Sequence, residues 1–370
     1  MNVPMADLAA QHRAIKPELT QVFDEIIDKS TFILGPNVSE LEREIAGVCG
    51  SQYGLGVNSG TDAILLALIA MGAGPGDEVI TTPFTFNATV ETICLAGATP
   101  VMVDIDPATY NIDPEKAAAA ITPRTKAIMP VHLFGQTADM NAFSKIAGTH
   151  NLRLIADAAQ AIGASHQDKP IGTWSDLTTL SFYPTKNLGG CGDGGMVVTD
   201  NAEFAERIRL FRFHGSGGGY YPKEVGYCSR LDELQAAILR VKARHLQAYN
   251  DSRRKNASSY FEQLGDLAEH ITLPHTAPGN HHIFHQFTIR VKHGKRDALK
   301  DFLASRGVGS GVFYPLPLHM TDAYAKYGKG EGSLPHAEAA GREVLSIPVH
   351  PELTSTHVDY VAAAIREFFK

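Results

Sequence analysis

Lys186 stands in the stretch of this sequence that is richest in groups able to do chemistry. Residues 181–195 follow a predicted strand, and five of the seven residues from 189 to 195 are glycine. Glycines let the backbone approach a planar ligand closely, and a lysine amine among them could bond covalently to a carbonyl group. A lysine in a loop is more often a solvated surface charge, so this stretch alone does not define a site.

A carboxylate at the end of another predicted strand could complete the same site. Residues 152–156 are predicted to form a strand that leads to Asp157, and Gln160 follows three residues later. Ligands bind at the strand ends of open α/β sheets, and a carboxylate there can pair with a pyridine nitrogen and keep the ring electron-accepting. If a helix begins at Asp157, Gln160 lies on the same face and could donate to a phenolic oxygen of the ring. A helix N-cap is the plainer alternative for Asp157.

Two further segments could hold a phosphate group and a planar ring. Ser59, Gly60 and Thr61 precede an apolar run at residues 63–68, which predicts a helix N-terminus whose free amides attract phosphate. Phe86 comes just after another predicted strand, where its ring could stack on a cofactor. Taken singly, these segments are more often an ordinary helix cap and a core phenylalanine.

Short apolar runs alternate with helical patterns between about residues 55 and 200. Runs this apolar on both faces are typical of strands in a parallel sheet covered by helices. We therefore predict an α/β fold with a mostly parallel central sheet flanked by helices. The predicted strands are residues 78–81, 100–103, 127–131, 152–156, 178–181 and 196–199, and a helix is predicted at residues 87–95.

After residue 200 the pattern becomes mainly helical, with one predicted strand at residues 287–291. Helices are predicted at residues 201–213, 295–306 and 357–369, and one long helix from about Arg230 past Tyr249. These elements predict two domains, a large domain at residues 1–250 and a smaller C-terminal α+β domain at residues 251–370. The glycine-rich residues 214–221 predict a loop.

Charge and composition limit the classes of partner. The formal net charge is −7 and the pI is about 6.1, which argues against a nucleic-acid polymer or an anionic membrane. No signal-peptide pattern and no apolar run of roughly 18 residues is present, so we expect a cytoplasmic protein. The four cysteines form no C-x-x-C pair, and His281, His282 and His285 lack a partner carboxylate nearby. No metal site is therefore predicted, and these histidines are expected at a surface or an interface.

Together, the order and spacing of these segments resemble the DegT/DnrJ/EryC1/StrS aminotransferases, which have the aspartate-aminotransferase fold (fold type I). The resemblance runs nearly from end to end of the chain. It implies pyridoxal 5'-phosphate as cofactor and a homodimer with active sites shared between subunits. The residues that carry it are 32–36, 59–63, 131–136, 157–160, 181–195, 230–237, 314–319 and 345–351.

The resemblance also implies a role for individual residues. Lys186 matches the lysine that holds the cofactor covalently, Asp157 the partner of the pyridine nitrogen and Gln160 the neighbour of the phenolate. The other implied cofactor contacts are Gly60, Thr61, Phe86, Ser181 and Cys228. The implied substrate contacts, some of them made to the neighbouring subunit, are Phe32, Thr185, Arg230, Phe313, Tyr314 and His319.

The implied reaction depends on Lys186, because some relatives that are sugar dehydratases have histidine at this position. Its presence favours transfer of an amino group from L-glutamate to a keto-sugar, with the closest likeness to enzymes of 3-keto nucleotide-linked hexoses or hexuronates. Another fold-type-I reaction, such as sugar dehydration or lyase chemistry, is an alternative. A cofactor-binding regulator without turnover is a third.

Two positions depart from the family pattern. Relatives usually have asparagine where Cys228 stands, and that asparagine reaches the neighbouring subunit's cofactor phosphate. They usually have histidine where Phe313 stands. Cysteine is a weak hydrogen-bond donor, and phenylalanine removes a polar contact from the substrate pocket. We expect weaker cofactor binding or a less polar acceptor.

Overall fold

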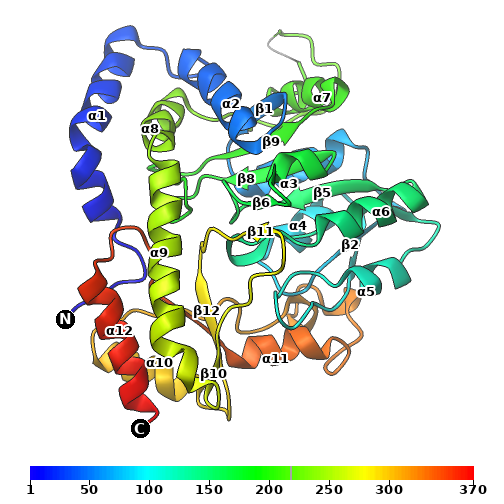
Figure 1. Cartoon of the computed structure of the whole chain (residues 1–370). Coiled ribbons are helices and arrows are strands. Elements are labelled where there is room, and N and C mark those ends of the chain that lie inside the picture. Colours follow the sequence, from blue (N-terminus) through cyan, green and yellow to red (C-terminus); the bar gives the residue numbers. More distant parts are fainter. Residues whose placement is uncertain (217–218) are drawn as a thin grey trace.

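A seven-stranded sheet forms the centre of the computed structural model, which describes residues 1–216 and 219–370 (Figure 1). Its order is β1-β9-β8-β5-β4-β2-β3, and β9 alone runs antiparallel to its neighbours. The mostly parallel α/β sheet predicted from the sequence is therefore confirmed. The strands are β1 (Tyr53–Val57), β2 (Glu78–Thr81), β3 (Thr99–Met102), β4 (Thr125–Ile128), β5 (Arg153–Asp157), β8 (Leu177–Ser181) and β9 (Gly195–Thr199).

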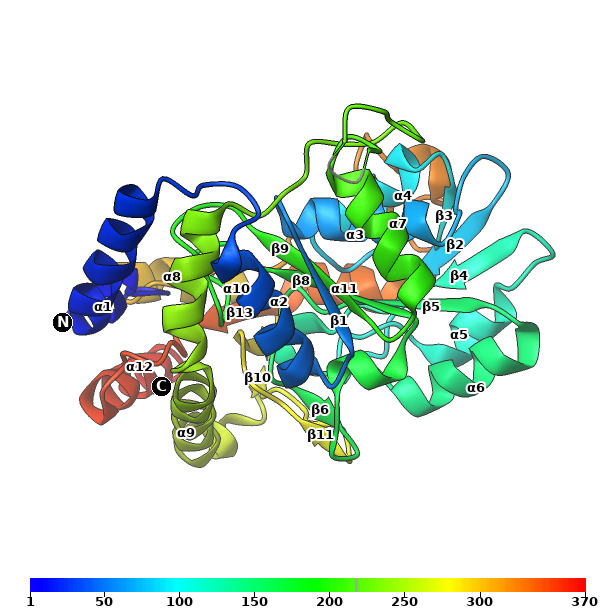
Figure 2. The same ribbon diagram turned by 90° about the horizontal axis from the view of Figure 1, so that it is seen from above.

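Helices cover both faces of this sheet, as its apolar strands require. On one face α3 (Gly60–Ala70), α4 (Ala88–Leu95) and α7 (Ala202–Arg212) pack against side chains such as Leu55 and Val197. On the other face, α2 (Pro36–Cys49) and α8 (Glu233–Ala243) pack against Met196 and Val198, the neighbours of Val197 in β9. Toward the β3 edge, α5 (Pro114–Ala119) and α6 (Met140–His150) cover this second face. Figure 2 shows the sheet between these two groups of helices.

A second core lies around a small antiparallel sheet. Strands β10 (Ile271–Thr272), β12 (Phe287–Val291) and β13 (Val344–Ile347) pair in that order and pack on α9 (Leu246–Leu264), α10 (Arg296–Ser305) and α12 (Ser355–Phe368). Val3 joins this core from the N-terminus through a bridge to Val308. The division into domains at residue 250 stays a prediction. The remaining helices are α1 (Leu8–Lys29) and α11 (Pro335–Glu343), and a short ribbon contains β6 (Ser165–His166), β7 (Lys169–Pro170) and β11 (Asn280–His281).

The single long helix predicted from about Arg230 past Tyr249 is wrong. The chain forms α8 and then α9, with Arg244 and His245 between them. Leu239 of α8 packs in the core under the large sheet, whereas Ala257 and Tyr260 of α9 pack in the second core. Leu246, the first residue of α9, still packs in the core of the large sheet, so the change from one core to the other falls within α9.

Two features bear on the sequence-based expectations. Of the predicted loop at residues 214–221, residues 217–218 lie outside the described structure, so that prediction is only partly addressed. Throughout residues 1–216 and 219–370, no helix is long and apolar enough to cross a membrane. The same residues contain no group of three or more histidine, cysteine, aspartate or glutamate side chains placed to hold a metal ion.

Candidate active site

The parallel strands β2, β4, β5 and β8 end at one edge of the sheet, where ligands bind in open α/β folds. Asp157 is the last residue of β5, and Ser181 is the last residue of the adjacent β8. Lys186 follows in a tight turn, in which its backbone N–H donates to the carbonyl oxygen of Tyr183 at 2.8 Å. The sheet thus brings to one edge the amine and the carboxylate that the sequence singled out.

The Asp157 carboxylate is buried, with 4% of the residue exposed, and both of its oxygens accept hydrogen bonds. Thr89 in α4 donates its hydroxyl to Oδ2 at 2.7 Å, and the Ala159 backbone N–H donates to Oδ1 at 3.2 Å. Because Thr89 donates there, Thr85 must donate to the Thr89 hydroxyl, 2.9 Å away. Burial raises the pKa of Asp157, and these bonds and the charge of Lys186 oppose that rise by favouring the ionised form.

Lys186 is partly exposed as a whole residue and lies close enough to this carboxylate for their charges to interact. Burial lowers the pKa of Lys186 to about 8, and the negative charge of Asp157 acts in the opposite direction. An ordinary lysine has a pKa near 10.4. A substantial fraction of Lys186 is therefore neutral near pH 8, and only the neutral amine can attack a carbonyl carbon.

Gln160 lies at the same edge, although no helix begins at Asp157. The carbonyl oxygen of Asp157 accepts from the His132 N–H at 2.9 Å, whereas Ala161 N–H bonds to Ala158. The carbonyl that would close the first helical turn is thus occupied by a neighbouring strand segment. Gln160 is oriented instead by the Phe134 N–H, which donates to its Oε1 at 2.7 Å.

Aromatic rings stand close to the amide of Gln160. Its Nε2 donates to the hydroxyl of Tyr314 at 3.2 Å. The ring of Phe86 lies 6.4 Å from the Tyr314 ring, centroid to centroid, and 59% of Phe86 is exposed. Burial raises the pKa of Tyr314, so its hydroxyl keeps its proton. An exposed aromatic face beside these polar groups suits a planar ligand.

The N-terminus of α3 adjoins the end of β8. Ser59 caps the helix by accepting the Asp62 N–H at 3.0 Å, which leaves the first-turn amides of Gly60 and Thr61 without intrahelical partners. A Cβ at Gly60 would lie 2.6 Å from the Cβ of Ser181, so only glycine permits this close approach. The amides of the helix end and the Ser181 hydroxyl form an anion-binding set.

The predicted substrate residues take different positions. Phe32 and Thr185 are exposed, and Arg230 lies over the Phe213 ring, 4.9 Å from its centroid. Arg230 also donates from Nη2 to the sulfur of the exposed Cys228 at 2.9 Å. Phe313 is partly buried beside Tyr314.

His319 is the exception among these substrate predictions. It is buried, with 1% exposed, and its Nε2 lies 3.1 Å from Glu338. In this conformation the imidazole is not accessible to a ligand. Its contact with substrate stays a prediction.

Three residues at this edge had no role in the sequence-based prediction. Thr89 supports Asp157, and its place in the segment after Phe86 was the one available signal. Asn187 and His285 are buried next to Lys186 and bond to each other. His281, His282 and His285 were expected at a surface or an interface, and the surface alternative is wrong for His282 and His285, which are 5% and 7% exposed. A buried histidine can form hydrogen bonds with partners from distant segments. The residues next to it in the sequence do not reveal those partners.

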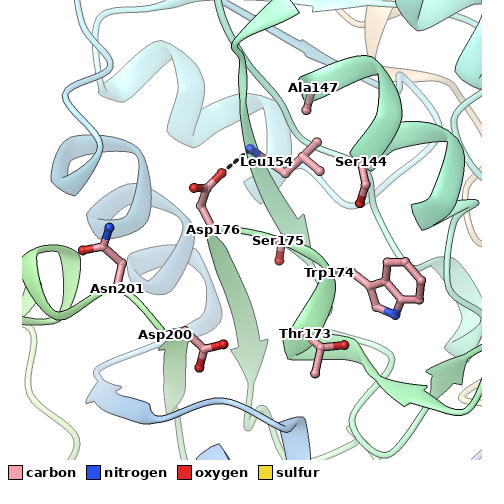
Figure 3. Close-up of a pocket in the computed structure, with 9 residues that line it drawn as sticks. All are labelled: Ser144, Ala147, Leu154, Thr173, Trp174, Ser175, Asp176, Asp200 and Asn201. Atoms are coloured by element: carbon pink, nitrogen blue, oxygen red, sulfur yellow. Dashed lines mark hydrogen bonds between the residues drawn. The ribbon is translucent and has the colours of Figure 1, made fainter. Parts of the chain in front are cut away.

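A cavity away from this site lies at the other edge of the large sheet. It has a volume of about 500 Å³ and is lined by residues such as Trp174, Asp176 and Asn201 (Figure 3). Asp176 accepts the Leu154 N–H there at 2.9 Å, at the start of β5. This cavity therefore lies at the opposite, amino-terminal edge of the sheet. It contains none of the predicted site residues.

Pyridoxal phosphate fits the residues at the carboxyl edge. Lys186 offers an amine of lowered pKa, Asp157 a buried carboxylate, and Phe86 an exposed ring face. The end of α3 offers amides to a phosphate group, at a place where a Cβ on Gly60 would intrude. Fold and site together define a class, the pyridoxal-phosphate-dependent aminotransferases of fold type I.

Within that class, the chain belongs to the DegT/DnrJ/EryC1/StrS aminotransferase family, whose family model matches residues 13–366. It is 51% identical to the pleiotropic regulatory protein of Geobacillus stearothermophilus, over 100% of this chain and 99% of that one. It is 46% identical to a UDP-N-acetyl-3-dehydro-alpha-D-glucosamine 3-aminotransferase of Acidithiobacillus ferrooxidans, over 98% and 97%. The crystal structure of S. venezuelae DesV in complex with a ketimine intermediate matches with a TM-score of 0.97 and 42% identity, over 99% and 98% of the two chains.

Proposed function

We propose that this protein transfers an amino group from L-glutamate to a keto-sugar, a 3-keto nucleotide-linked hexose or hexuronate, as a cytoplasmic homodimer. The observation that carries the proposal is an amine, Lys186, whose pKa burial lowers to about 8 at the carboxyl edge beside a buried carboxylate. This pair suits reversible attachment of pyridoxal phosphate. The Acidithiobacillus ferrooxidans relative is named for a 3-dehydro sugar nucleotide, which supports a 3-keto acceptor.

Each residue at the site has a task that its surroundings support. When bound, pyridoxal phosphate supplies an electron sink for the carbon that loses its proton. Lys186 would hold the cofactor through Nζ and, once released, move a proton from the Cα of the amino donor to the cofactor carbon. A pKa of about 8 suits both directions of that transfer. Asp157, whose two oxygens accept from Thr89 and Ala159, would pair with the ring nitrogen.

The remaining residues bind and orient. Gly60, Thr61 and Ser181 would hold the phosphate, and Phe86 would cover one ring face. Gln160, held by the Phe134 N–H and bonded to Tyr314, would donate to the phenolic oxygen. Phe32, Thr185, Arg230, Phe313 and Tyr314 would contact the sugar substrate, with some contacts made across the dimer.

A second candidate function is that of a cofactor-binding regulator without turnover. The name of the Geobacillus stearothermophilus relative, pleiotropic regulatory protein, favours it. A regulator needs no proton-transfer base, however, and Lys186 combines a lowered pKa with a neighbouring carboxylate. An aminotransferase function therefore accounts for more of the site.

The deciding experiment adds L-glutamate to purified protein loaded with pyridoxal phosphate. We expect the cofactor absorbance to shift to that of pyridoxamine phosphate, with release of 2-oxoglutarate, because Lys186 can move the proton. Adding 3-keto sugar nucleotides to the product should restore the starting spectrum, and a Lys186→Ala variant should do neither. An unchanged spectrum with L-glutamate and with the other amino acids would contradict aminotransfer and favour the regulator.

A further inference from the structure

A chain of buried hydrogen bonds begins next to Lys186 and ends at a backbone carbonyl. Asn250 in α9 donates from Nδ2 to the carbonyl oxygen of Ile162 at 3.1 Å. Asn187 donates from Nδ2 to Oδ1 of Asn250 at 2.8 Å, and Nδ1 of His285 lies 3.0 Å from Oδ1 of Asn187. Asn187, Asn250 and His285 are 5%, 2% and 7% exposed. The polar atoms of these side chains must therefore find their hydrogen-bond partners within the protein.

The carbonyl of Ile162 at the end of this chain determines which atom donates in each of its hydrogen bonds. A carbonyl oxygen only accepts, so the Asn250 amide must turn its nitrogen toward Ile162 and its oxygen toward Asn187. Asn187 must then donate from its nitrogen and accept at its oxygen. The proton between Asn187 and His285 must consequently sit on Nδ1 of the imidazole.

The backbone around His285 is held as firmly as its ring. Arg253, one turn after Asn250 in α9, donates from Nη1 to the carbonyl oxygens of His285 at 3.2 Å and Phe284 at 3.3 Å. On the other side, a Cβ at Gly135 would lie 2.7 Å from the backbone nitrogen of His285. One face of α9 thus holds both ends of the contact between His285 and Asn187.

Electrostatics keeps this ring neutral. Burial lowers the pKa of His285 well below its usual value, and the positive charges of Lys186 and Arg253 lower it further. With Nδ1 bearing the proton and the ring uncharged, Nε2 has a lone pair. The charged groups that act here are Lys186 after β8, Arg253 in α9 and, on the other side of Lys186, Asp157 at the end of β5.

We propose that His285 and Asn187 are positioning residues for Lys186. The Nδ1–H of a neutral His285 locks the Asn187 side chain, which fixes the adjoining Lys186 backbone and so directs the amine toward the cofactor and the proton it transfers. This inference rests on the proposed function of Lys186. It adds two residues that act through Lys186. His285 lies in the loop before β12, and Asn187 lies in the same turn as Lys186.

The test compares two replacements of His285 in the cofactor-loaded enzyme. His285→Asn places an amide nitrogen near the position of Nδ1 and keeps the donor, whereas His285→Leu removes it. We expect His285→Leu to move the pH midpoint of the cofactor absorbance by about one unit. We also expect it to lower kcat for the L-glutamate half-reaction by about 10- to 100-fold with little change in KM, because the amine is misdirected. His285→Asn should restore both to near wild type.

Three further variants separate positioning from general damage. His282→Leu is the matched control, because His282 is equally buried but contacts Phe284, accepting its N–H at 3.0 Å. It should leave the absorbance midpoint unchanged. Asn187→Leu should shift the midpoint at least as much as His285→Leu, because it also removes the bond to Asn250. The double variant should be no worse than Asn187→Leu alone, since that change already breaks the contact with His285. Melting followed by circular dichroism checks that each variant folds.

The outcomes distinguish this inference from the proposed function. If wild type fails to bind pyridoxal phosphate at Lys186, the proposed function fails first and this inference with it. If wild type binds it and His285→Leu keeps the wild-type midpoint and kcat, only the positioning role is overturned. The positioning role is also overturned if His285→Asn is as impaired as His285→Leu, or if His282→Leu shifts the midpoint equally.

Discussion

Two physical effects act in opposite directions on the pKa of Lys186. Burial penalises the ammonium form, and the carboxylate of Asp157 stabilises it. Burial dominates, which leaves the pKa at about 8. Loss of the carboxylate would lower it further, so Asp157 sets the reactivity of the amine as well as pairing with a ring nitrogen.

The pKa of Lys186 predicts how cofactor attachment depends on pH. In protein freed of cofactor, the neutral fraction of the amine falls about tenfold for each pH unit below the pKa. The rate of attachment of pyridoxal phosphate should therefore rise about tenfold from about pH 6.5 to about 7.5 and level off above about pH 8. Stopped-flow absorbance measures this rate. Nα-acetyl-lysine is the control and should level off only near pH 10.4; the same late plateau in the protein would contradict a lowered pKa.

Cys228 is the residue whose replacement tests the weaker-cofactor hypothesis. Its sulfur is exposed and accepts from Arg230, and it offers only a weak donor. Cys228→Asn should add a hydrogen bond to a charged phosphate, which contributes about 1.5–3 kcal/mol, or roughly a 10- to 100-fold lower Kd for pyridoxal phosphate. Titration of cofactor-free protein measures that Kd. Cys191→Asn, at another exposed cysteine, is the control, and an unchanged Kd in Cys228→Asn would refute the hypothesis.

At the scale of elements, the site depends on the contact between the start of α3 and the end of β8. Gly60→Ala would place a Cβ 2.6 Å from the Cβ of Ser181, so one of the two elements must shift. Such overpacking typically costs about 1–3 kcal/mol, and the shift should also weaken phosphate binding. Denaturant unfolding and a pyridoxal phosphate titration measure the two effects.

Gly47→Ala is the matched control for that change. Gly47 lies within α2, and a Cβ there meets nothing within 4 Å. Alanine should stabilise the helix by up to about 1 kcal/mol and leave cofactor binding unchanged. Equal behaviour of the two variants would show that the contact between Gly60 and Ser181 does not support the site.

Six of the seven strands of the large sheet were predicted, because short apolar runs between turn signals are typical of buried strands. The edge strand β1 was not predicted. The break between α8 and α9 was not predicted, since Arg244 and His245, which form it, include no glycine or proline to signal it. The turn after Asp157 also depends on a distant segment. A long-range bond from the His132 N–H takes the carbonyl that a helix would need.

The candidate site was more predictable than the packing around it. Asp157, Gly60 and Ser181 occur at strand or helix ends and Lys186 in the turn after β8, positions that a sequence pattern can locate, and the structure gathers them at one edge. The support of these residues was not predictable. His285 lies 98 residues from its partner Asn187, and its burial follows from tertiary contacts alone.

At the scale of the whole molecule, one helix connects the site with the second core. Asn250 and Arg253 in α9 hold the residues beside Lys186, and Ala257, Tyr260 and Leu264 pack around the small sheet. A shift of the second core would therefore reach the amine through a single rigid element. Figure 1 shows α9 continuing below α8 and running down beside α12.

Exposed apolar side chains at the N-terminus favour a dimer. Phe23 and Ile27 share a face of α1 and are 46% and 50% exposed, and Phe32 and Ile33 follow at 48% and 49%. Apolar side chains gathered in this way mark interaction surfaces. Phe32 is also a predicted substrate contact, so the same surface would serve both assembly and the active site.

Phe23→Asp tests this surface. A charge there should convert the dimer to monomer in sedimentation velocity and lower aminotransfer at least about tenfold, because sites shared across the dimer lose residues. Leu95→Asp is the control, since Leu95 is 63% exposed at the end of α4, away from α1 in Figures 1 and 2. A Phe23→Asp protein that stays dimeric would exclude α1 from the interface.

The identity of the lysine that carries the cofactor is the most direct test of the proposed chemistry. Borohydride reduction of the cofactor-loaded protein fixes the cofactor carbon to its amine, and mass spectrometry of the peptides then locates it. We expect a phosphopyridoxyl group on Lys186 alone. The wild-type protein reduced without cofactor should have no such group. A group on any other lysine, with Lys186 unmodified, would show that Lys186 does not hold the cofactor.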